Sequence, residues 1–68
     1  MSERLANRIK SERERTGLTQ AALAERVGVS RKTINTVENS VFTPSATLAI
    51  KLAEALELNV EQLFWIER

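Results

Sequence analysis

Helix start and stop signals follow one another closely along this chain and leave room for little except short helices. A Ser, Thr or Asn side chain can cap a helix by accepting a hydrogen bond from its first free N–H groups, and a glycine can end one. Here each capping residue precedes apolar side chains at helical spacing, as with Leu48, Leu52 and Leu56. The signals predict five helices, which begin after Ser2, Thr19, Ser30, Ser45 and Asn59, with Gly17 and Gly28 as stops for the first two.

The sequence offers no credible strand, so we expect an all-α fold, a compact five-helix bundle in which residues 1–68 form a single domain. A chain of 68 residues buries only about 60% of its unfolded surface. Stability then requires efficient helix packing or a partner's surface.

Composition excludes most catalytic and metal chemistry. The chain has no cysteine and no histidine, so disulfides, soft zinc ligands and a Ser-His or Cys-His nucleophile are ruled out. Its two glycines are too few for a glycine-rich phosphate loop. We therefore expect no enzyme, no cofactor, no metal site and no small-molecule ligand domain.

The net charge of +1 conceals two halves of opposite sign. Residues 1–40 carry eight basic and five acidic side chains, whereas residues 41–68 carry two and four. The basic half is able to face a polyanion such as nucleic acid. No apolar run exceeds four residues, and the N-terminal stretch "MSERLANRIK" has no signal-peptide core. We therefore expect a cytoplasmic, nucleoid-associated protein without a membrane span.

The stretch from residue 20 to residue 39 carries the functional signal. Two short helical patterns are joined by a three-residue turn, in which Gly28 supplies the positive φ that reverses the chain. The inward positions of the two helices are Leu23 and Val27, then Ile34 and Val37. This pattern is typical of a helix-turn-helix, whose second helix enters the DNA major groove.

The opposite face of the second helix suits the edges of DNA bases. It presents cationic, amide and hydroxyl groups and no carboxylate, from Arg31, Lys32, Asn35, Thr36 and Asn39. Arg and Lys can donate to guanine O6 and N7, and Asn can pair with adenine. The alternative interpretation is an ordinary solvated helix face.

Three stretches of the sequence carry a family resemblance, namely "GLTQAALAERVGVSRKTINTVEN", "PS" before the fourth helix and the late "EQLF". Over roughly residues 5–65 the chain resembles the phage-repressor-like (Xre-type) helix-turn-helix regulators. The resemblance implies a role for each matching position. Base-reading positions map to Arg31, Lys32, Asn35 and Thr36, and phosphate or backbone contacts map to Gln20, Ser30, Thr33 and Asn39. The following loop, Ser40-Val41-Phe42-Thr43, lacks the basic residues common there in the family, which implies fewer phosphate contacts.

Glu38 lies on the inward flank of the second helix of the motif, beside Ile34, rather than on its outward face. The family resemblance implies that Glu38 pairs with Arg13 of the first helix and that the pair is partly buried. The alternative is a surface glutamate that contributes almost nothing to stability.

The C-terminal segment carries more apolar side chains than a short helix can bury. Leu63 and Phe64 are expected in the core, which leaves Trp65 and Ile66 exposed. We therefore predict a symmetric homodimer whose interface contains Phe42, Val60, Trp65 and Ile66. In the alternative, Trp65 folds back onto the first helix as a lid over the core.

These observations favour a sequence-specific regulator of transcription that binds double-stranded DNA as a homodimer on a palindromic operator and acts as a repressor. A second interpretation keeps the fold but makes the main target a protein, as in an antitoxin-like interaction module. A third is a generic helical bundle that uses its apolar C-terminal segment only for assembly. The basic, acid-free helix face favours the first.

Overall fold

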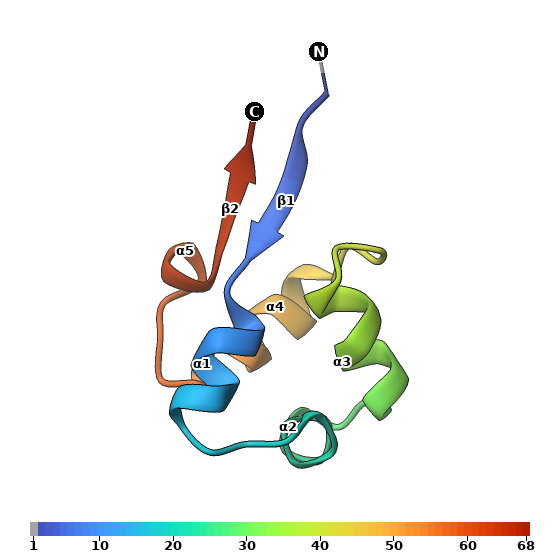
Figure 1. The fold of residues 1–68 in the computed structure, drawn as a ribbon, viewed down its shortest axis with the longest axis vertical. Helices are drawn as coiled ribbons and strands as arrows, with labels where there is room; N and C mark the ends of the chain where they lie inside the picture. Colours follow the sequence, from blue (N-terminus) through green and yellow to red (C-terminus); the bar gives the residue numbers. More distant parts are fainter. Residues whose placement is uncertain (1) are drawn as a thin grey trace.

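The computed structural model describes residues 2–68, in which two short strands accompany five helices (Figure 1). Strand β1 (Arg4–Asn7) leads into α1 (Ile9–Arg15), which is followed by α2 (Gln20–Val27) and α3 (Arg31–Glu38). Helix α4 (Ala46–Ala55) and the single-turn helix α5 (Val60–Leu63) come next and lead into β2 (Phe64–Glu67).

The two strands form an antiparallel ribbon that projects from the helical body (Figure 1). Leu5 pairs with Ile66 and Ala6 pairs with Trp65. The expectation of a purely helical fold was therefore wrong at both ends. The segment after Ser2 is a strand, and the last helix stops before Phe64. Each strand depends on a partner at the far end of the sequence, which local periodicity cannot reveal.

Helix α1 consequently begins at Ile9 instead of after Ser2. The Ile9 N–H donates to the side-chain oxygen of Asn7 at 3.0 Å, so Asn7 supplies the hydrogen bond that Ser2 was expected to give.

The other helix starts follow the predicted caps. The side-chain oxygens of Thr19, Ser30 and Ser45 each accept the N–H of the residue three positions later, at 3.0, 3.2 and 3.1 Å. Before α5, the Asn59 N–H donates to the side chain of Gln62 at 2.8 Å. Gly28 ends α2 with φ +78°, and after α3 the left-handed position is taken by Ser40, with φ +59°.

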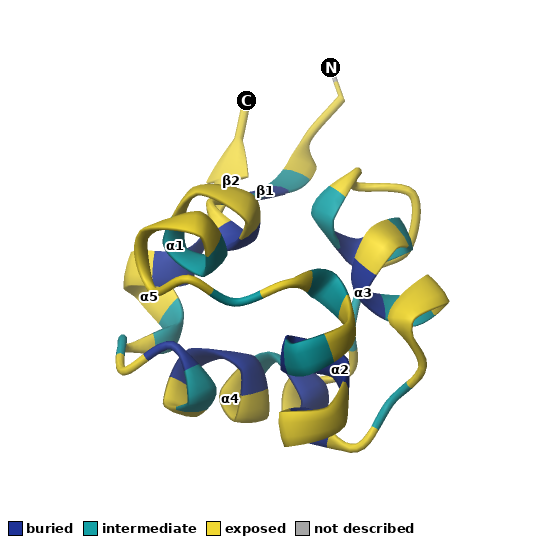
Figure 2. Ribbon diagram, turned by 60° about the horizontal axis from the view of Figure 1, so that its bottom comes forward, coloured by how far each residue is buried: buried dark blue, intermediate teal, exposed yellow. Residues whose placement is uncertain are grey.

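The hydrophobic core lies where the helices face one another (Figure 2). Every helix contributes at least one fully buried aliphatic side chain, namely Ile9, Leu23, Ile34, Leu52 and Leu63. Burying each such side chain is worth about 1.5–3 kcal/mol. Since α3 places both Ile34 and Val37 in this core, packing fixes the rotation of α3 about its own axis and determines which of its residues face outward.

Within residues 2–68, no helix has the length and apolar character needed to cross a membrane. The same part of the chain holds no cluster of three or more His, Cys, Asp or Glu residues placed to bind a metal ion.

Replacing Gly28 with Ala is expected to lower the free energy of unfolding by about 1–2 kcal/mol. A Cβ at this position would meet no atom within 4 Å, so the cost comes only from the left-handed backbone at φ +78°. Chemical denaturation measures the change. The control is Gly28→Asn, which should cost less because Asn tolerates the left-handed region. An alanine variant as stable as the original protein would contradict this account.

Candidate nucleic-acid interface

Helices α2 and α3 pack against each other across a short turn. The N–H groups of Gly28 and Val29 both donate to the carbonyl of Ala24, at 2.9 and 3.0 Å. Ser30 then opens α3 by accepting the Thr33 N–H. Because both ends of the turn are fixed, α3 is held at a defined angle to α2, which is the arrangement of a helix-turn-helix.

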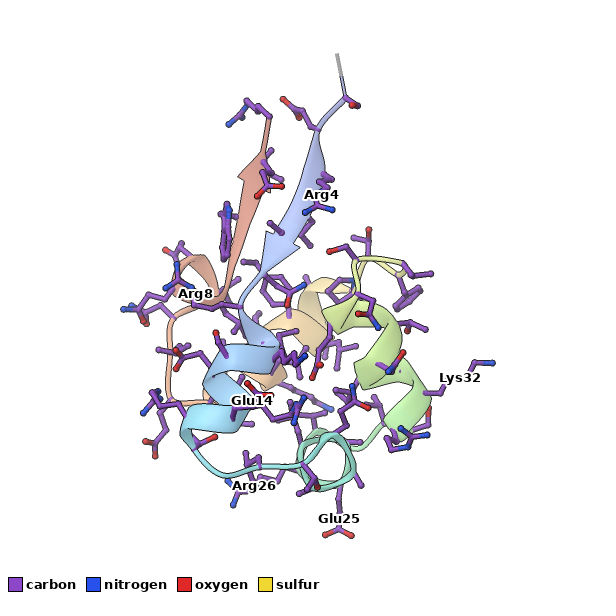
Figure 3. All side chains as sticks on the ribbon, in the orientation of Figure 1. Arg4, Arg8, Glu14, Glu25, Arg26 and Lys32 are labelled. Atoms are coloured by element: carbon purple, nitrogen blue, oxygen red, sulfur yellow. The ribbon has the colours of Figure 1, made fainter. Side chains whose placement is uncertain are left out.

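Helix α3 has one buried and one exposed face. Ile34 and Val37 are buried, whereas Arg31, Lys32 and Asn35 are exposed. Figure 3 shows Lys32 pointing away from the body of the molecule. No ion pair among residues 2–68 engages Arg31 or Lys32. Both cations are therefore available to an external anion.

The two threonines and the two asparagines of this helix face are partly engaged with one another. Thr33 and Thr36 are half-buried. The hydroxyl of Thr33 lies 3.0 Å from that of Ser30, and the Thr36 hydroxyl donates to the Thr33 carbonyl at 2.9 Å. The Asn39 amide donates to the carbonyl and to the side-chain oxygen of Asn35, at 3.0 and 3.1 Å. These bonds orient the polar groups before any ligand arrives.

The single carboxylate of α3 is turned away from the exposed face and neutralised. Arg13 of α1 donates to both carboxylate oxygens of Glu38, at 2.7 and 3.3 Å. The side chains of Arg13 and Glu38 are only 11% and 4% exposed. The hydrogen bonds from Arg13 to Glu38 raise the pKa of the Arg13 guanidinium above its ordinary value. This pair ties α1 to α3 and removes the acid from the exposed surface.

A chain of side-chain hydrogen bonds extends from this pair to the start of α3. Gln20, the first residue of α2, donates to Glu38 at 3.2 Å and accepts from Arg31 at 3.3 Å. Gln20 was expected to hold a phosphate. In the structure its side chain connects the buried pair to the exposed Arg31 at the start of α3.

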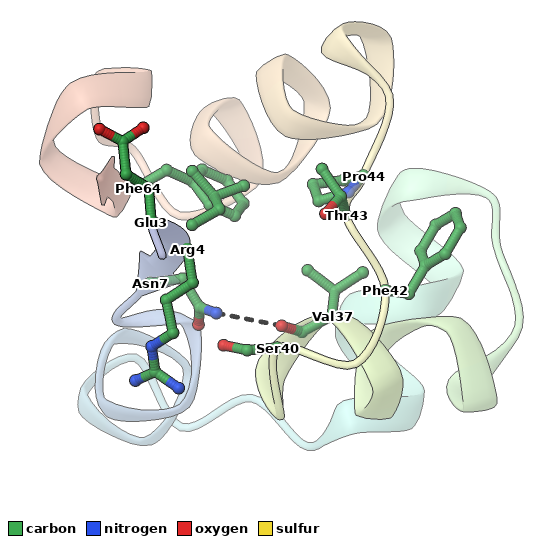
Figure 4. Close-up of a pocket in the computed structure, with 10 residues that line it drawn as sticks. Glu3, Arg4, Asn7, Val37, Ser40, Phe42, Thr43, Pro44 and Phe64 are labelled. Carbon is green, nitrogen blue, oxygen red and sulfur yellow. Dashed lines mark hydrogen bonds between the residues drawn. The ribbon is translucent and has the colours of Figure 1, made fainter. Parts of the chain in front are cut away.

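Asn7 is a positioning residue that the sequence reasoning missed. Its side-chain amide donates to the carbonyl of Val37 at 3.0 Å (Figure 4), while its oxygen accepts the Ile9 N–H. Asn7 thus links the start of α1 to the end of α3. An asparagine two residues before the apolar Ile9 is a helix-capping signal that could have identified it.

The four residues predicted to form a dimer interface are distributed over different surfaces. Val60 is half-buried against the core. Trp65 and Ile66 are exposed neighbours on β2, so they point to opposite faces of the ribbon. The Arg8 guanidinium lies 5.0 Å from the centre of the Trp65 ring. Phe42 lies in the loop after α3, across a hollow from β1 (Figure 4).

Comparison with known proteins yields matches along most of the chain. The helix-turn-helix family model matches residues 9–63. The uncharacterised HTH-type transcriptional regulator YgzD of Bacillus subtilis is 38% identical over 63 residues, which are 93% of this chain and 96% of YgzD. The antitoxin HipB of Escherichia coli O6:H1 is 38% identical over 56 residues, which are 82% of this chain and 60% of HipB.

A solved structure shows the same fold in a complex with DNA. The P22 c2 repressor, crystallised with a synthetic operator, matches with a TM-score of 0.75 and 32% identity. The match covers 78% of this chain and 80% of the repressor chain.

Replacing Glu38 with Ala is expected to lower the free energy of unfolding by about 3–5 kcal/mol, because Arg13 would remain buried without its partner. Since the pKa of Arg13 is raised, the contribution of its charged form is fully present at neutral pH and is lost as the pH rises through the raised pKa. Thermal and chemical denaturation at neutral pH measure the loss.

The control is Glu67→Ala, which removes an exposed partner of Arg4. Its cost should stay below about 1 kcal/mol. Equal effects of the two substitutions would show that the buried pair contributes no more than a surface pair.

Proposed function

The chain belongs to the phage-repressor-like (Xre-type) helix-turn-helix family of DNA-binding transcriptional regulators, and on that premise we propose that it binds double-stranded DNA sequence-specifically through α3. We propose further that it acts as a homodimer that represses transcription by occupying a palindromic operator. The observation that carries the proposal is the exposed face of α3, which presents two cations without ion-pair partners among residues 2–68, while its one acid is buried against Arg13.

The bases are read by Arg31, Lys32, Asn35 and Thr36. Arg31 and Lys32 lie in the first turn of α3, where the recognition helix of such motifs contacts base edges. Their donors suit guanine O6 and N7, and Asn35 one turn later suits adenine. Gln20 supports this assignment by holding the Arg31 guanidinium with a hydrogen bond of 3.3 Å.

Contacts to the DNA backbone set the register of the complex. Ser30 and Thr33 present hydroxyls at the start of α3, and Asn39 presents an amide at its end. Gln20 remains a candidate for a phosphate contact if its bond to Glu38 is exchanged for one to DNA. Neutral donors of this kind position a protein on the duplex without reading sequence.

The dimer is proposed to form through the ribbon. Trp65 and Ile66 expose large apolar surfaces on β2, and both ribbon edges have free backbone groups for pairing with a second copy. Val60, which is half-buried against the core on α5, is included in the proposed interface. A twofold arrangement would place two α3 helices about 34 Å apart on a palindrome.

The antitoxin HipB is a reason to keep a protein target as the second candidate function, since HipB is 38% identical to this chain. DNA binding through the phosphate backbone produces a steep dependence of affinity on salt concentration. Binding of random duplex DNA that is insensitive to salt, or no binding at all, would favour the protein target.

Selection of bound sequences from random duplex DNA is the experiment that tests the proposal as a whole. A palindromic consensus whose half-sites are about one helical turn apart is the expected result. Failure to enrich any sequence would overturn sequence-specific binding.

Lys32→Ala is expected to weaken binding to the selected consensus by about 1–3 kcal/mol and to leave binding to random DNA nearly unchanged. Fluorescence anisotropy with labelled duplexes measures both affinities. The control is Lys51→Ala, which removes an exposed lysine of α4. An equal loss on consensus and random DNA would make Lys32 a phosphate contact instead of a base-reading residue.

Trp65→Ala is expected to shift the dimer toward monomer in sedimentation velocity and to weaken binding to a full palindrome more than to one half-site. The matched control is Ile50→Ala, which removes an exposed apolar side chain from α4. An unchanged dimer would place the interface away from Trp65.

A further inference from the structure

Asn7, the last residue of β1, connects the ribbon to α3. Its side-chain amide donates to the carbonyl of Val37 at 3.0 Å, and within the described part of the chain no other hydrogen bond joins the ribbon to α3 or to the loop that follows it. The ribbon holds Asn7 in this position, because Asn7 pairs with Phe64 and the Arg8 N–H donates to the carbonyl of Leu63 at 3.0 Å. Opening of the ribbon would therefore withdraw the amide from α3.

The carbonyl that receives this bond also fixes the turn at the end of α3. Val37 accepts the Ser40 N–H at 3.1 Å, and Ser40 has a left-handed backbone with φ +59°, which is unfavourable for a residue with a Cβ. The next two N–H groups, from Val41 and Phe42, both donate to the carbonyl of Thr36. The end of α3 is thus held by its own loop and by β1 together.

Packing does not take over the work of this hydrogen bond. A hollow of about 220 Å³ lies between β1 and the loop after α3, and its lining includes Asn7, Val37 and Ser40. Figure 4 shows the hydrogen bond joining the two walls of the hollow. Because side chains leave this space open, the position of the end of α3 relative to the ribbon depends on the Asn7 amide.

The turn of α3 that Asn7 reaches carries three of the DNA contacts proposed above. Asn35 and Thr36 are assigned to the bases and Asn39 to the DNA backbone. The Asn39 amide donates to the carbonyl and to the side-chain oxygen of Asn35, at 3.0 and 3.1 Å, so the two side chains move together. Groups that recognise a ligand must be held within about 0.5 Å of their productive geometry. A small shift of this turn would therefore weaken several contacts at once.

We propose that Asn7 is a positioning residue for DNA recognition, which couples closure of the ribbon to the geometry of the last turn of α3. The proposal rests on the function proposed above. A two-stranded ribbon is only marginally stable by itself, so the two states are a closed ribbon with Asn7 bonded to Val37 and a frayed ribbon without that bond. DNA that binds the positioned turn favours the closed state, and by linkage the closed ribbon favours DNA.

The coupling also relates the two surfaces of the proposed dimer. Trp65 and Ile66, which are assigned to the contact with a second copy, lie on the strand that pairs with β1. A second copy that holds the ribbon closed would thereby favour the DNA-binding geometry of α3. This gain is separate from the gain that comes from binding two half-sites with one dimer.

The first test is Asn7→Ser, which keeps a side-chain oxygen able to accept the Ile9 N–H but removes the amide that reaches Val37. Its affinity for the sequence selected from random DNA should fall about fivefold for each half-site, with binding to random DNA nearly unchanged. Fluorescence anisotropy measures both affinities, and thermal melts set a temperature at which the variant is folded. The control is Asn59→Ser, which makes the same change at the start of α5 and should bind as the wild type.

The second test measures hydrogen exchange of the backbone amides of β1 and β2. Saturation with a duplex that carries a single half-site, so that DNA brings no second copy to the ribbon, should slow this exchange about fivefold in the wild type, because linkage is reciprocal. In Asn7→Ser the same duplex should leave the ribbon amides unaffected. A merely structural role for Asn7 would speed exchange in the free variant but preserve the effect of DNA.

Two outcomes would overturn the coupling and leave the proposed function standing. One is Asn7→Ser protein that binds the selected sequence as tightly as the wild type. The other is a ribbon whose exchange responds to the half-site equally in both proteins, or in neither. Wild-type protein for which no sequence can be selected would overturn the proposed function together with this inference.

Discussion

The arrangement of the exposed face of α3 depends on the buried ion pair between Arg13 and Glu38. A carboxylate on a helix that approaches phosphates would repel them, and an unpaired buried carboxylate would destabilise the fold. Pairing solves both problems, because Glu38 is 4% exposed and accepts two hydrogen bonds from Arg13. Gln20 extends the connection to Arg31. The pair therefore stabilises the helix assembly and also sets the electrostatic sign of the surface.

The ribbon and Asn7 connect the two ends of the described chain to the helical core and to α3. A two-stranded ribbon is only marginally stable by itself, and here Phe64 anchors it in the core. Asn7 joins its base to the carbonyl of Val37 at the end of α3. Helix α3 is thus held by its buried side chains in the core, by Arg13 at Glu38, and by Asn7 at the carbonyl of Val37. These attachments explain how so short a helix can present side chains in a defined geometry.

Sequence reasoning predicted the features that depend on residues close together in the chain, such as the helix caps. It missed the strands, which depend on pairing between residues at opposite ends of the chain. The caps at Thr19, Ser30 and Ser45 were predicted correctly because each hydrogen bond spans three residues. The ribbon was missed because Leu5 and Ile66 meet only after the whole chain has folded. Leu5 and Ile9 happen to lie four residues apart, which imitates a helix face. The contact between Arg13 and Glu38 is equally distant, and only the family resemblance pointed to it.

The distribution of charge on α3 limits how the molecule can achieve affinity. Each neutralised phosphate contributes a slope of about −0.9 to the dependence of log affinity on log salt, and the loop from residue 40 to residue 43 carries no basic residue to add such contacts. If the chain binds DNA as proposed, one copy, with two α3 cations outside any ion pair among residues 2–68, would have little non-specific attraction to hold it there. On the proposed function, selectivity would come from contacts to base edges, and affinity would come from two copies that bind together. On that proposal, the low charge of the exposed α3 face and the exposed apolar residues of the ribbon have complementary roles, the first in selectivity and the second in joining two copies.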